Sequence, residues 1–181
     1  MRTEIRLSGR GGQGLILAGI VLAEAAGVYE DKQVVQTQSY GPEARGGASR
    51  AEVIISDGQI RYPQAYDPDI LVALSQPAFD RFAPKIKKSG LIFADSFYVH
   101  TDRKDVVLIP FSETARNEIG REVVTNVVML GALAAATDIV RLESLKKALR
   151  HRVRSVFLDL NLRAVDAGYK LGKEIWKKRS S

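Results

Sequence analysis

The residues best suited to chemistry form the run Gly9-Arg10-Gly11-Gly12-Gln13-Gly14. Glycine allows a turn to adopt positive φ and lets backbone N–H groups approach an anion closely. A helix that begins directly after the turn directs its positive dipole end at the same point. The predicted chemistry is the non-covalent binding of a phosphate or another anion, and the alternative is a tight turn with no ligand. The predicted cofactor-binding residues are Gly9, Arg10, Gly11, Gly12, Gln13 and Gly14.

A second glycine-bearing loop has the sequence SYGPEARGGASR over residues 39–50. If it follows a strand parallel to the first, it emerges at the same sheet edge as the glycine loop, where α/β proteins bind ligands. Arg45 and Arg50 are suited to bidentate recognition of a phosphate or carboxylate. Glu43 could hold Arg45 in place or act as an acid or base if buried, whereas in a plain surface loop it would only pair with Arg45. The residues predicted to bind ligand here are Ser39, Tyr40, Arg45, Gly46 and Gly47.

The sequence lacks the residues that most kinds of catalysis require. Cysteine is absent, which excludes disulfides, thiolate nucleophiles and cysteine ligation of zinc or iron–sulfur clusters. The two histidines, His100 and His151, are far apart and have no acidic neighbours at ligand spacing. No Ser-His-Asp set, paired-carboxylate motif or Walker A lysine is found. We therefore predict no catalytic residue and no metal site, and a domain that contributes to a site completed by other chains.

The sequence also lacks an acidic residue that dinucleotide binding requires. Such a fold places an acidic residue at the end of its second strand, where it binds the ribose hydroxyls. Residues 34–39 read VVQTQS, and the nearest acids, Glu30 and Asp31, precede the strand. The chain thus has a phosphate-binding loop without the ribose-binding acid, which disfavours NAD or FAD.

The secondary structure that must position these loops is predicted from the sequence, in which short apolar runs typical of strands alternate with helical segments. Strands are predicted at residues 5–7, 33–38, 50–55, 68–75, 91–94 and 106–110. Asp57-Gly58 is a hairpin signal that would pair residues 59–62 with 50–55. Helices are predicted at residues 15–26 with Gly27 as the stop, and at 76–88, 112–139, 142–157 and 159–178. The fold class is α/β: a Rossmann-like, mainly parallel sheet with helices on both faces, an inserted β-hairpin and C-terminal helices, in a single domain over residues 1–181.

Composition is that of a globular protein, with 45% hydrophobic and 27% charged residues in 181. No apolar run reaches the roughly 18 residues of a membrane span, and the N-terminus has no secretory pattern, so a cytoplasmic location is expected. The net charge is +6. No nucleic-acid-binding motif is recognised among the basic residues of the C-terminal part of the sequence, which argues against nucleic-acid binding. These basic residues are Lys146, Lys147, Arg150, Arg152, Arg154, Lys173, Lys177, Lys178 and Arg179.

The two loops together resemble one family, the gamma subunit of 2-oxoacid:ferredoxin oxidoreductases. The resemblance covers nearly the whole chain in order, and the SYGPE sequence of the second loop is most similar to the 2-oxoglutarate type and the indolepyruvate type. Pyruvate-type gamma subunits usually differ there. The segments that carry it are Gly9-Arg10-Gly11-Gly12-Gln13-Gly14, Ser39-Tyr40-Gly41-Pro42-Glu43-x-Arg45-Gly46-Gly47 and the later helix with Asn126 and Gly131.

The resemblance implies a subunit that is inactive alone. The complex would decarboxylate a 2-oxoacid on thiamine diphosphate with Mg, pass electrons singly to ferredoxin and release an acyl-CoA. The partners implied are alpha, beta and ferredoxin-like delta subunits, with the iron–sulfur clusters on other chains. The two glycine-bearing loops would help to accommodate coenzyme A near the active-site mouth.

Two other functions remain open at the level of the sequence. A stand-alone nucleotide-binding dehydrogenase domain would bind NAD tightly despite the missing acid. A purely structural interaction module would have two loops that bind nothing. Within the resemblance, an indolepyruvate-type subunit is the alternative to the 2-oxoglutarate type.

Overall fold

Strand β1 (Arg2–Gly9) lies inside the sheet because both of its edges are paired. It runs antiparallel to β3 (Ser49–Ser56) and parallel to β4 (Ile70–Ala73). The other strands are β2 (Gln33–Gln38), β5 (Leu91–Asp95) and β6 (Val106–Ile109). The computed structural model describes residues 1–38 and 48–179, and its sheet has the strand order β2-β3-β1-β4-β5-β6.

The predicted hairpin at Asp57-Gly58 is wrong. Strand β3 pairs with β2 on one edge and with β1 on the other, so it has no free edge for residues 59–62. Those residues form no strand and belong to the connection that leads to β4. The antiparallel insertion is real, but it consists of β3 between β2 and β1.

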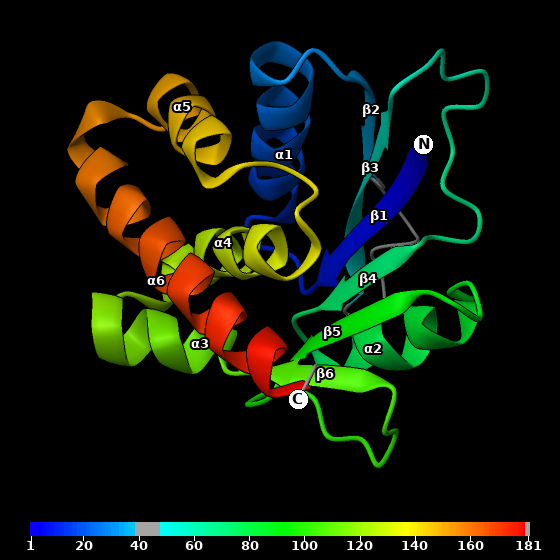
Figure 1. Cartoon of the computed structure of the whole chain (residues 1–181). Coiled ribbons are helices and arrows are strands. Elements are labelled where there is room, and N and C mark those ends of the chain that lie inside the picture. Colours follow the sequence, from blue (N-terminus) through cyan, green and yellow to red (C-terminus); the bar gives the residue numbers. More distant parts are fainter. Residues whose placement is uncertain (39–47, 180–181) are drawn as a thin grey trace.

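Helices cover the two faces of the sheet unequally, as Figure 1 shows. Helix α2 (Gln76–Phe82) packs on the second face, against β1 and β4. The short α3 (Phe111–Thr114) packs beside α4. The predicted α/β class, with a mainly parallel sheet and helices on both faces, is confirmed. The first face carries α1 (Leu15–Tyr29), α4 (Thr125–Thr137), α5 (Leu142–Arg152) and α6 (Ser155–Arg179).

Three predicted helix boundaries move for local reasons. Helix α1 continues through Gly27, where a Cβ would meet Cγ2 of Val34 at 2.7 Å, so this glycine serves the close approach to β2 rather than a stop. Helix α2 ends at Phe82 because Pro84 has no N–H to continue the helix. The long helix predicted over 112–139 is interrupted at Gly120, which has a φ of 82°.

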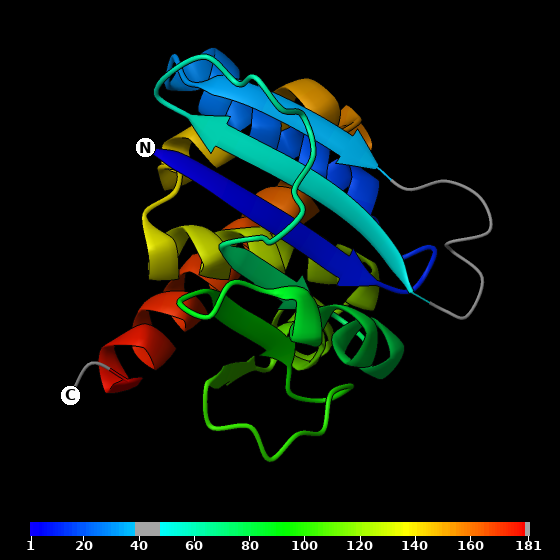
Figure 2. The same cartoon turned by 90° about the vertical axis from the view of Figure 1, so that its right-hand side faces the viewer.

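Side chains of β1 alternate between the two faces of the sheet. Ile5 and Leu7 enter the large core beneath α1 and α4, whereas Arg6 and Ser8 point to the second face. On that face α2 covers only part of the sheet. The connection over residues 57–69 crosses the rest, in front of β3 and β1 in Figure 2.

Helices α4 and α6 cross in close contact because glycines lie where they meet. A Cβ on Gly168 would overlap the carbonyl group of Val128, and one on Gly131 would overlap that of Val165. This contact brings α4, and with it Asn126, into a fixed position beneath the carboxyl edge of the sheet.

Gly168→Ala is expected to destabilise the protein by about 1–3 kcal/mol or more, because the added methyl group must separate two packed backbones. Gly58→Ala is the matched control, since a Cβ there meets nothing within 4 Å. Urea denaturation followed by circular dichroism measures both variants. Equal unfolding midpoints for the two variants would contradict the proposed role of the α4–α6 contact.

Helix α1 is tied to the end of α5 by the buried carboxylate of Glu24, which pairs with Arg152 and with Nδ1 of His151 at 2.6 Å. Burial raises the pKa of Glu24, but the hydrogen bonds from Arg152 and His151 outweigh this effect and leave the pKa below its ordinary value. A carboxyl group with a lowered folded-state pKa stabilises the fold above its unfolded-state pKa, and this contribution is lost as pH falls through the folded-state pKa.

Glu24→Gln is therefore expected to cost about 1.5–3 kcal/mol at pH 7, the usual range for a hydrogen bond to a charged group. The difference from the parent protein should shrink as the pH is lowered towards about 4. Unfolding free energies at several pH values measure this, with Glu174→Gln on the exposed side of α6 as control. A pH-independent difference would show that the charge of Glu24 has no such role.

Candidate functional site

The carboxyl edge of the sheet brings the two predicted loops to one place. In the strand register Gly9 faces Ser49, and Leu7 and Gln38 both face Ala51 from opposite sides of β3. The end of β1, the end of β2 and the start of β3 thus lie at the same edge. Segment 39–47, with the predicted residues Ser39, Tyr40, Arg45, Gly46 and Gly47, lies outside the described residues, but the chain enters and leaves it at this edge.

The glycine loop is held in shape by Gln13. Its Oε1 accepts a hydrogen bond from the backbone N–H of Arg10 at 2.6 Å, and its Nε2 donates to the carbonyl oxygen of Leu74 at 3.2 Å. Gly12 and Gly14 have φ values of 87° and 70°, which only glycine adopts without strain. Gln13, predicted to bind ligand, is thus bonded within the loop and to the end of β4.

Helix α1 begins directly after this loop. Gly14 occupies the N-cap position, and no side chain of the described residues caps the helix. The carbonyl oxygen of Gly14 accepts hydrogen bonds from the backbone N–H of Ala18 and from Nδ2 of Asn126, each at 3.0 Å. Since the first N–H groups of a helix lack intrahelical acceptors and carry partial positive charge, this turn can bind an anion.

Gly11 and Gly12 leave the outer side of the loop open. A Cβ at either position would meet no atom within 4 Å. Internal packing therefore does not explain Gly11, whose φ is also not positive. The open space fits close approach by a group from outside the chain.

Arg10 extends from the loop over Tyr98, in the connection between β5 and β6. Its guanidinium carbon lies 5.0 Å from the ring centroid of Tyr98, and the Tyr98 hydroxyl donates to the carboxylate of Glu122 at 2.5 Å. The hydrogen bond to Glu122, together with burial, raises the pKa of Tyr98. Among the described residues no carboxylate forms an ion pair with Arg10 itself. The positive charge of Arg10 is thus available beside the helix dipole.

Asp95 positions Tyr98 from the carboxyl end of β5. Its buried carboxylate accepts hydrogen bonds from Phe97 N–H at 3.0 Å, and from the N–H and Oγ of Ser112 at 2.9 and 3.0 Å. Burial raises the pKa of Asp95, and these hydrogen bonds act in the opposite direction. The carboxylate fixes the turn after β5, and this turn places Tyr98 beside Arg10.

The sequence did not predict Asp95, Tyr98 or Glu122 as part of the site, and it gave Asn126 no role. A signal for two of them was available, because Asp95 and Tyr98 directly follow a buried strand whose carboxyl end lies at the binding edge. Glu122 and Asn126 come from the segment after the break at Gly120, more than a hundred residues from the loop in the case of Asn126. Only the folded chain places them there.

A partly apolar cavity of about 360 Å³ opens beside the glycine loop. Its wall includes Val123 and Phe157, which are 74% and 50% exposed. The helical spacing of Val123 with Val127 and Leu130 predicts a core position, and for Val123 this prediction is wrong. The apolar residues Leu171 and Trp176 of α6 lie among lysines, a pattern that predicts an interface. Both are instead partly buried and pack against the core, Trp176 beside Phe93. Val123 and Phe157 beside the loop are thus exposed, whereas these two residues of α6 are not.

The described residues contain neither a metal-binding cluster nor a membrane-spanning helix. They hold no group of three or more His, Asp or Glu side chains placed to share a metal ion. Within the same residues, no helix combines the length and the apolar character needed to cross a membrane.

Comparison with known proteins gives consistent matches over nearly the whole chain. The family model described as pyruvate ferredoxin/flavodoxin oxidoreductase matches residues 4–171. A 2-oxoglutarate synthase subunit KorC from Methanocaldococcus jannaschii is 51% identical, over 97% of this chain and 96% of the relative. The crystal structure of a keto/oxoacid ferredoxin oxidoreductase gamma subunit from Geobacter sulfurreducens has a TM-score of 0.87 at 44% identity, covering 97% of this chain and 98% of that one.

A third match is to a larger polypeptide. The 2-oxoglutarate:ferredoxin oxidoreductase from Magnetococcus marinus, solved with 2-oxoglutarate, coenzyme A and succinyl-CoA bound, has a TM-score of 0.78 at 25% identity. The match covers 96% of this chain but 31% of the other. In that enzyme the equivalent fold is part of a longer chain.

Asn126→Ala is expected to loosen the glycine loop, because it removes the bond from α4 to the Gly14 carbonyl. We expect a cost of about 1 kcal/mol in unfolding free energy and faster amide exchange at residues 11–15. Asn161→Ala is the matched control, since Nδ2 of Asn161 donates to the carbonyl oxygen of Phe157 at 2.8 Å. Hydrogen exchange measured by NMR distinguishes the two variants. Unchanged exchange in the loop of Asn126→Ala would contradict this role.

Proposed function

The chain belongs to the pyruvate ferredoxin/flavodoxin oxidoreductase family, and we propose that it is the gamma subunit of a 2-oxoglutarate:ferredoxin oxidoreductase. The observation that carries this proposal is the identity of 51% with a 2-oxoglutarate synthase subunit over nearly the full length of both chains. The SYGPE sequence of the second loop is compatible with this substrate class, but it resembles the indolepyruvate type as well as the 2-oxoglutarate type. The whole chain, residues 1–181, is proposed to be one gamma-type domain.

The reaction we propose for the complex is oxidative decarboxylation of 2-oxoglutarate to an acyl-CoA. Thiamine diphosphate with Mg would supply the carbanion chemistry, and iron–sulfur clusters would carry electrons singly to ferredoxin. This chain has no cysteine with which to ligate such clusters. The redox centres are therefore assigned to alpha, beta and ferredoxin-like delta partners.

The part assigned to this chain is to bind the phosphates of coenzyme A. The first turn of α1 supplies unpaired backbone N–H groups, and Arg10 adds a full positive charge beside them. Gly11 and Gly12 allow a phosphate to approach the backbone without obstruction by side chains. Segment 39–47, anchored at the same edge, would complete the site with the arginine and glycines predicted there.

The partner chains are proposed to cover the apolar surface beside the loop. Val123 and Phe157 are exposed at the rim of the cavity that Gly12 and Gly14 also line. Contiguous exposed apolar side chains of this kind mark interaction sites. A partner bound there would bring its own residues to the glycine loop, which fits a chain for which no catalytic residue is predicted.

Co-expression with the alpha, beta and delta chains encoded by the same organism tests the proposal. We expect a complex that reduces ferredoxin only when both 2-oxoglutarate and coenzyme A are present. Indolepyruvate in place of 2-oxoglutarate tests the alternative substrate class. If the chain never co-purifies with the other subunits, the proposed function fails.

Gly11→Val in the assembled complex is expected to raise KM for coenzyme A about tenfold, with a much smaller change in kcat, because it removes binding and not chemistry. The isolated variant should fold normally, since the new side chain enters open space. Steady-state kinetics with ferredoxin as acceptor measure the effect, and Gly58→Val is the control. An unchanged KM for coenzyme A in Gly11→Val would favour a purely structural role for the loop.

A further inference from the structure

Strand β2 is the last strand on one side of the sheet, and no strand lies beyond it among residues 1–38 and 48–179. Figure 2 shows β2 at the outer rim of the sheet with α1 behind it. A strand edge without a neighbour presents backbone N–H and C=O groups to which a further strand can bind. Proline, charged side chains and bulges usually protect such an edge, and the sequence QVVQTQ of β2 has none of them.

Helix α1, which lies beside this edge, has no polar face. Its sequence LILAGIVLAEAAGVY contains one charged residue, Glu24, and that carboxylate is buried. A helix at a protein surface normally turns polar residues to the solvent, and a helix that is apolar all round is normally buried. Ile20 is nevertheless only half-buried, and Val28 is 65% exposed. One side of α1 is thus an apolar surface that the described part of the chain leaves open.

The open side of α1 and the edge of β2 form one continuous surface. A cavity of about 410 Å³ opens between the two elements. The side chains of β2 that face α1 line it together with apolar residues of the helix. These lining residues include Ile20, Ala23 and Val28 of α1 and Val34 and Gln36 of β2. A strand added to β2 would therefore contact apolar side chains as well as the backbone edge.

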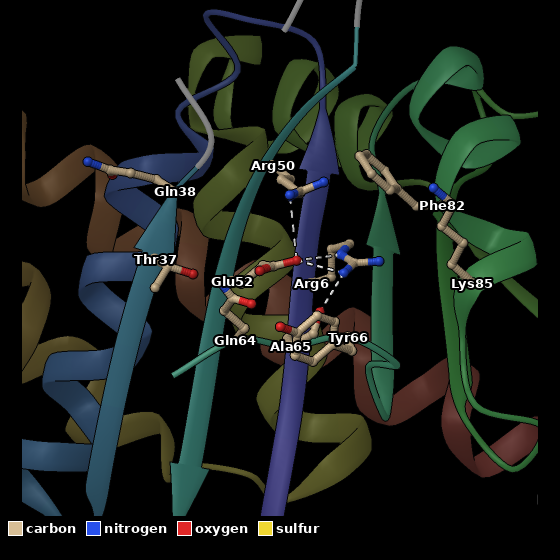
Figure 3. Close-up of a pocket in the computed structure, with 10 residues that line it drawn as sticks. All are labelled: Arg6, Thr37, Gln38, Arg50, Glu52, Gln64, Ala65, Tyr66, Phe82 and Lys85. Carbon is tan, nitrogen blue, oxygen red and sulfur yellow. Dashed lines mark hydrogen bonds and ion pairs between the residues drawn. The ribbon is translucent and has the colours of Figure 1, made fainter. Parts of the chain in front are cut away.

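The opposite face of β2 has a charged cavity instead of an apolar surface. Thr37 lines this cavity, which has a volume of about 570 Å³ and is shown in Figure 3. Arg6 at its base is already bonded, since its guanidinium donates to Glu52 and to the carbonyl oxygen of Ala65, each at 2.7 Å. An apolar partner would therefore bind on the α1 side of β2.

We propose that β2 pairs with β2 of a second copy of this chain, antiparallel across a two-fold axis, so that the two sheets become one. Strand β2 carries no charge, so this pairing places no like charges opposite each other. The two cations that line the cavity beside α1 are neutralised within their own chain. Lys32 pairs with Asp57, and Arg152 pairs with Glu24. A second copy thus meets an apolar surface without charge repulsion.

The position of α1 over the sheet supports the same arrangement. A Cβ on Gly19 would lie 3.1 Å from Cβ of Ala51 in β3 and 3.4 Å from Nε2 of Gln36 in β2, so α1 lies over both strands. In the joined sheet the two copies of α1 would be about two strand spacings apart, or roughly 10 Å. Packed helices have axes about 8–10 Å apart. Pairing of the strands therefore brings the two apolar helix surfaces into contact.

The length of the contact sets the expected affinity. The six residues of β2 span about 20 Å, and the 15 residues of α1 span about 22 Å. Such a strip falls at the small end of the range for specific interfaces, so we expect a dissociation constant on the order of 10 μM. This inference does not depend on the proposed function, because it uses no residue of the glycine loop.

Sedimentation velocity of the full-length chain over about 1–500 μM tests the pairing, and we expect a shift from monomer to dimer. Val28→Glu places a charge in the apolar contact and should raise the dissociation constant about tenfold or more. Val156→Glu is the matched control, because Val156 is also an exposed valine on a helix, 76% exposed against 65%. Circular dichroism verifies that both variants fold.

Hydrogen exchange identifies the surface that the dimer uses. We expect outward-pointing amides of β2 to exchange more slowly at high than at low protein concentration, whereas amides of β6, the edge strand on the other side, should not change. The proposal is overturned if the chain stays monomeric throughout, which would leave the edge to a strand of another subunit. It is also overturned if Val156→Glu weakens the dimer as much as Val28→Glu, or if a dimer forms without slower exchange in β2.

Discussion

The arrangement of this protein depends on the pairing of β1 on both of its edges. Because β3 runs antiparallel to it and β2 antiparallel to β3, the ends of β1 and β2 emerge at the same edge of the sheet. The parallel neighbours β4 and β5 bring Leu74 and Asp95 to that edge as well. The bond of Gln13 to Leu74 and the packing of Arg10 on Tyr98 depend on this common edge, and α4 adds the bond of Asn126 to Gly14.

The site combines the positive end of a helix dipole with a positively charged side chain. Helix α1 contributes its uncapped first turn, Arg10 contributes a charge, and Gln13 and Asn126 hold the loop between β4 and α4. Such a site is suited to binding and orienting an anion. The sequence has no cysteine, and the described residues hold no group of three or more His, Asp or Glu side chains placed to share a metal ion. This division of labour suits a subunit, since the partner chains can then supply the cofactors and close the apolar rim.

The unequal covering of the sheet creates two different environments. On the first face, four helices bury Ile5, Leu7 and their neighbours in one continuous core. On the second face, α2 covers only part of the sheet, and β1 and β3 place Arg6 and Glu52 there instead of apolar residues. The alternation of side chains along each strand thus produces both the core and the charged cavity.

The sequence by itself determined the class of fold, the strand–glycine loop–helix unit and the exclusion of cysteine-based chemistry, because these depend on local periodicity and composition. It misplaced the partner of β3 and missed Asp95, Tyr98 and Glu122, because strand pairing and contacts between distant segments leave no local pattern. Only the tertiary structure decided that Arg6 faces Glu52 and that the carbonyl of Gly14 meets Asn126. The physical reason is that strand register and helix packing depend on contacts throughout the core. No single segment of the sequence determines them.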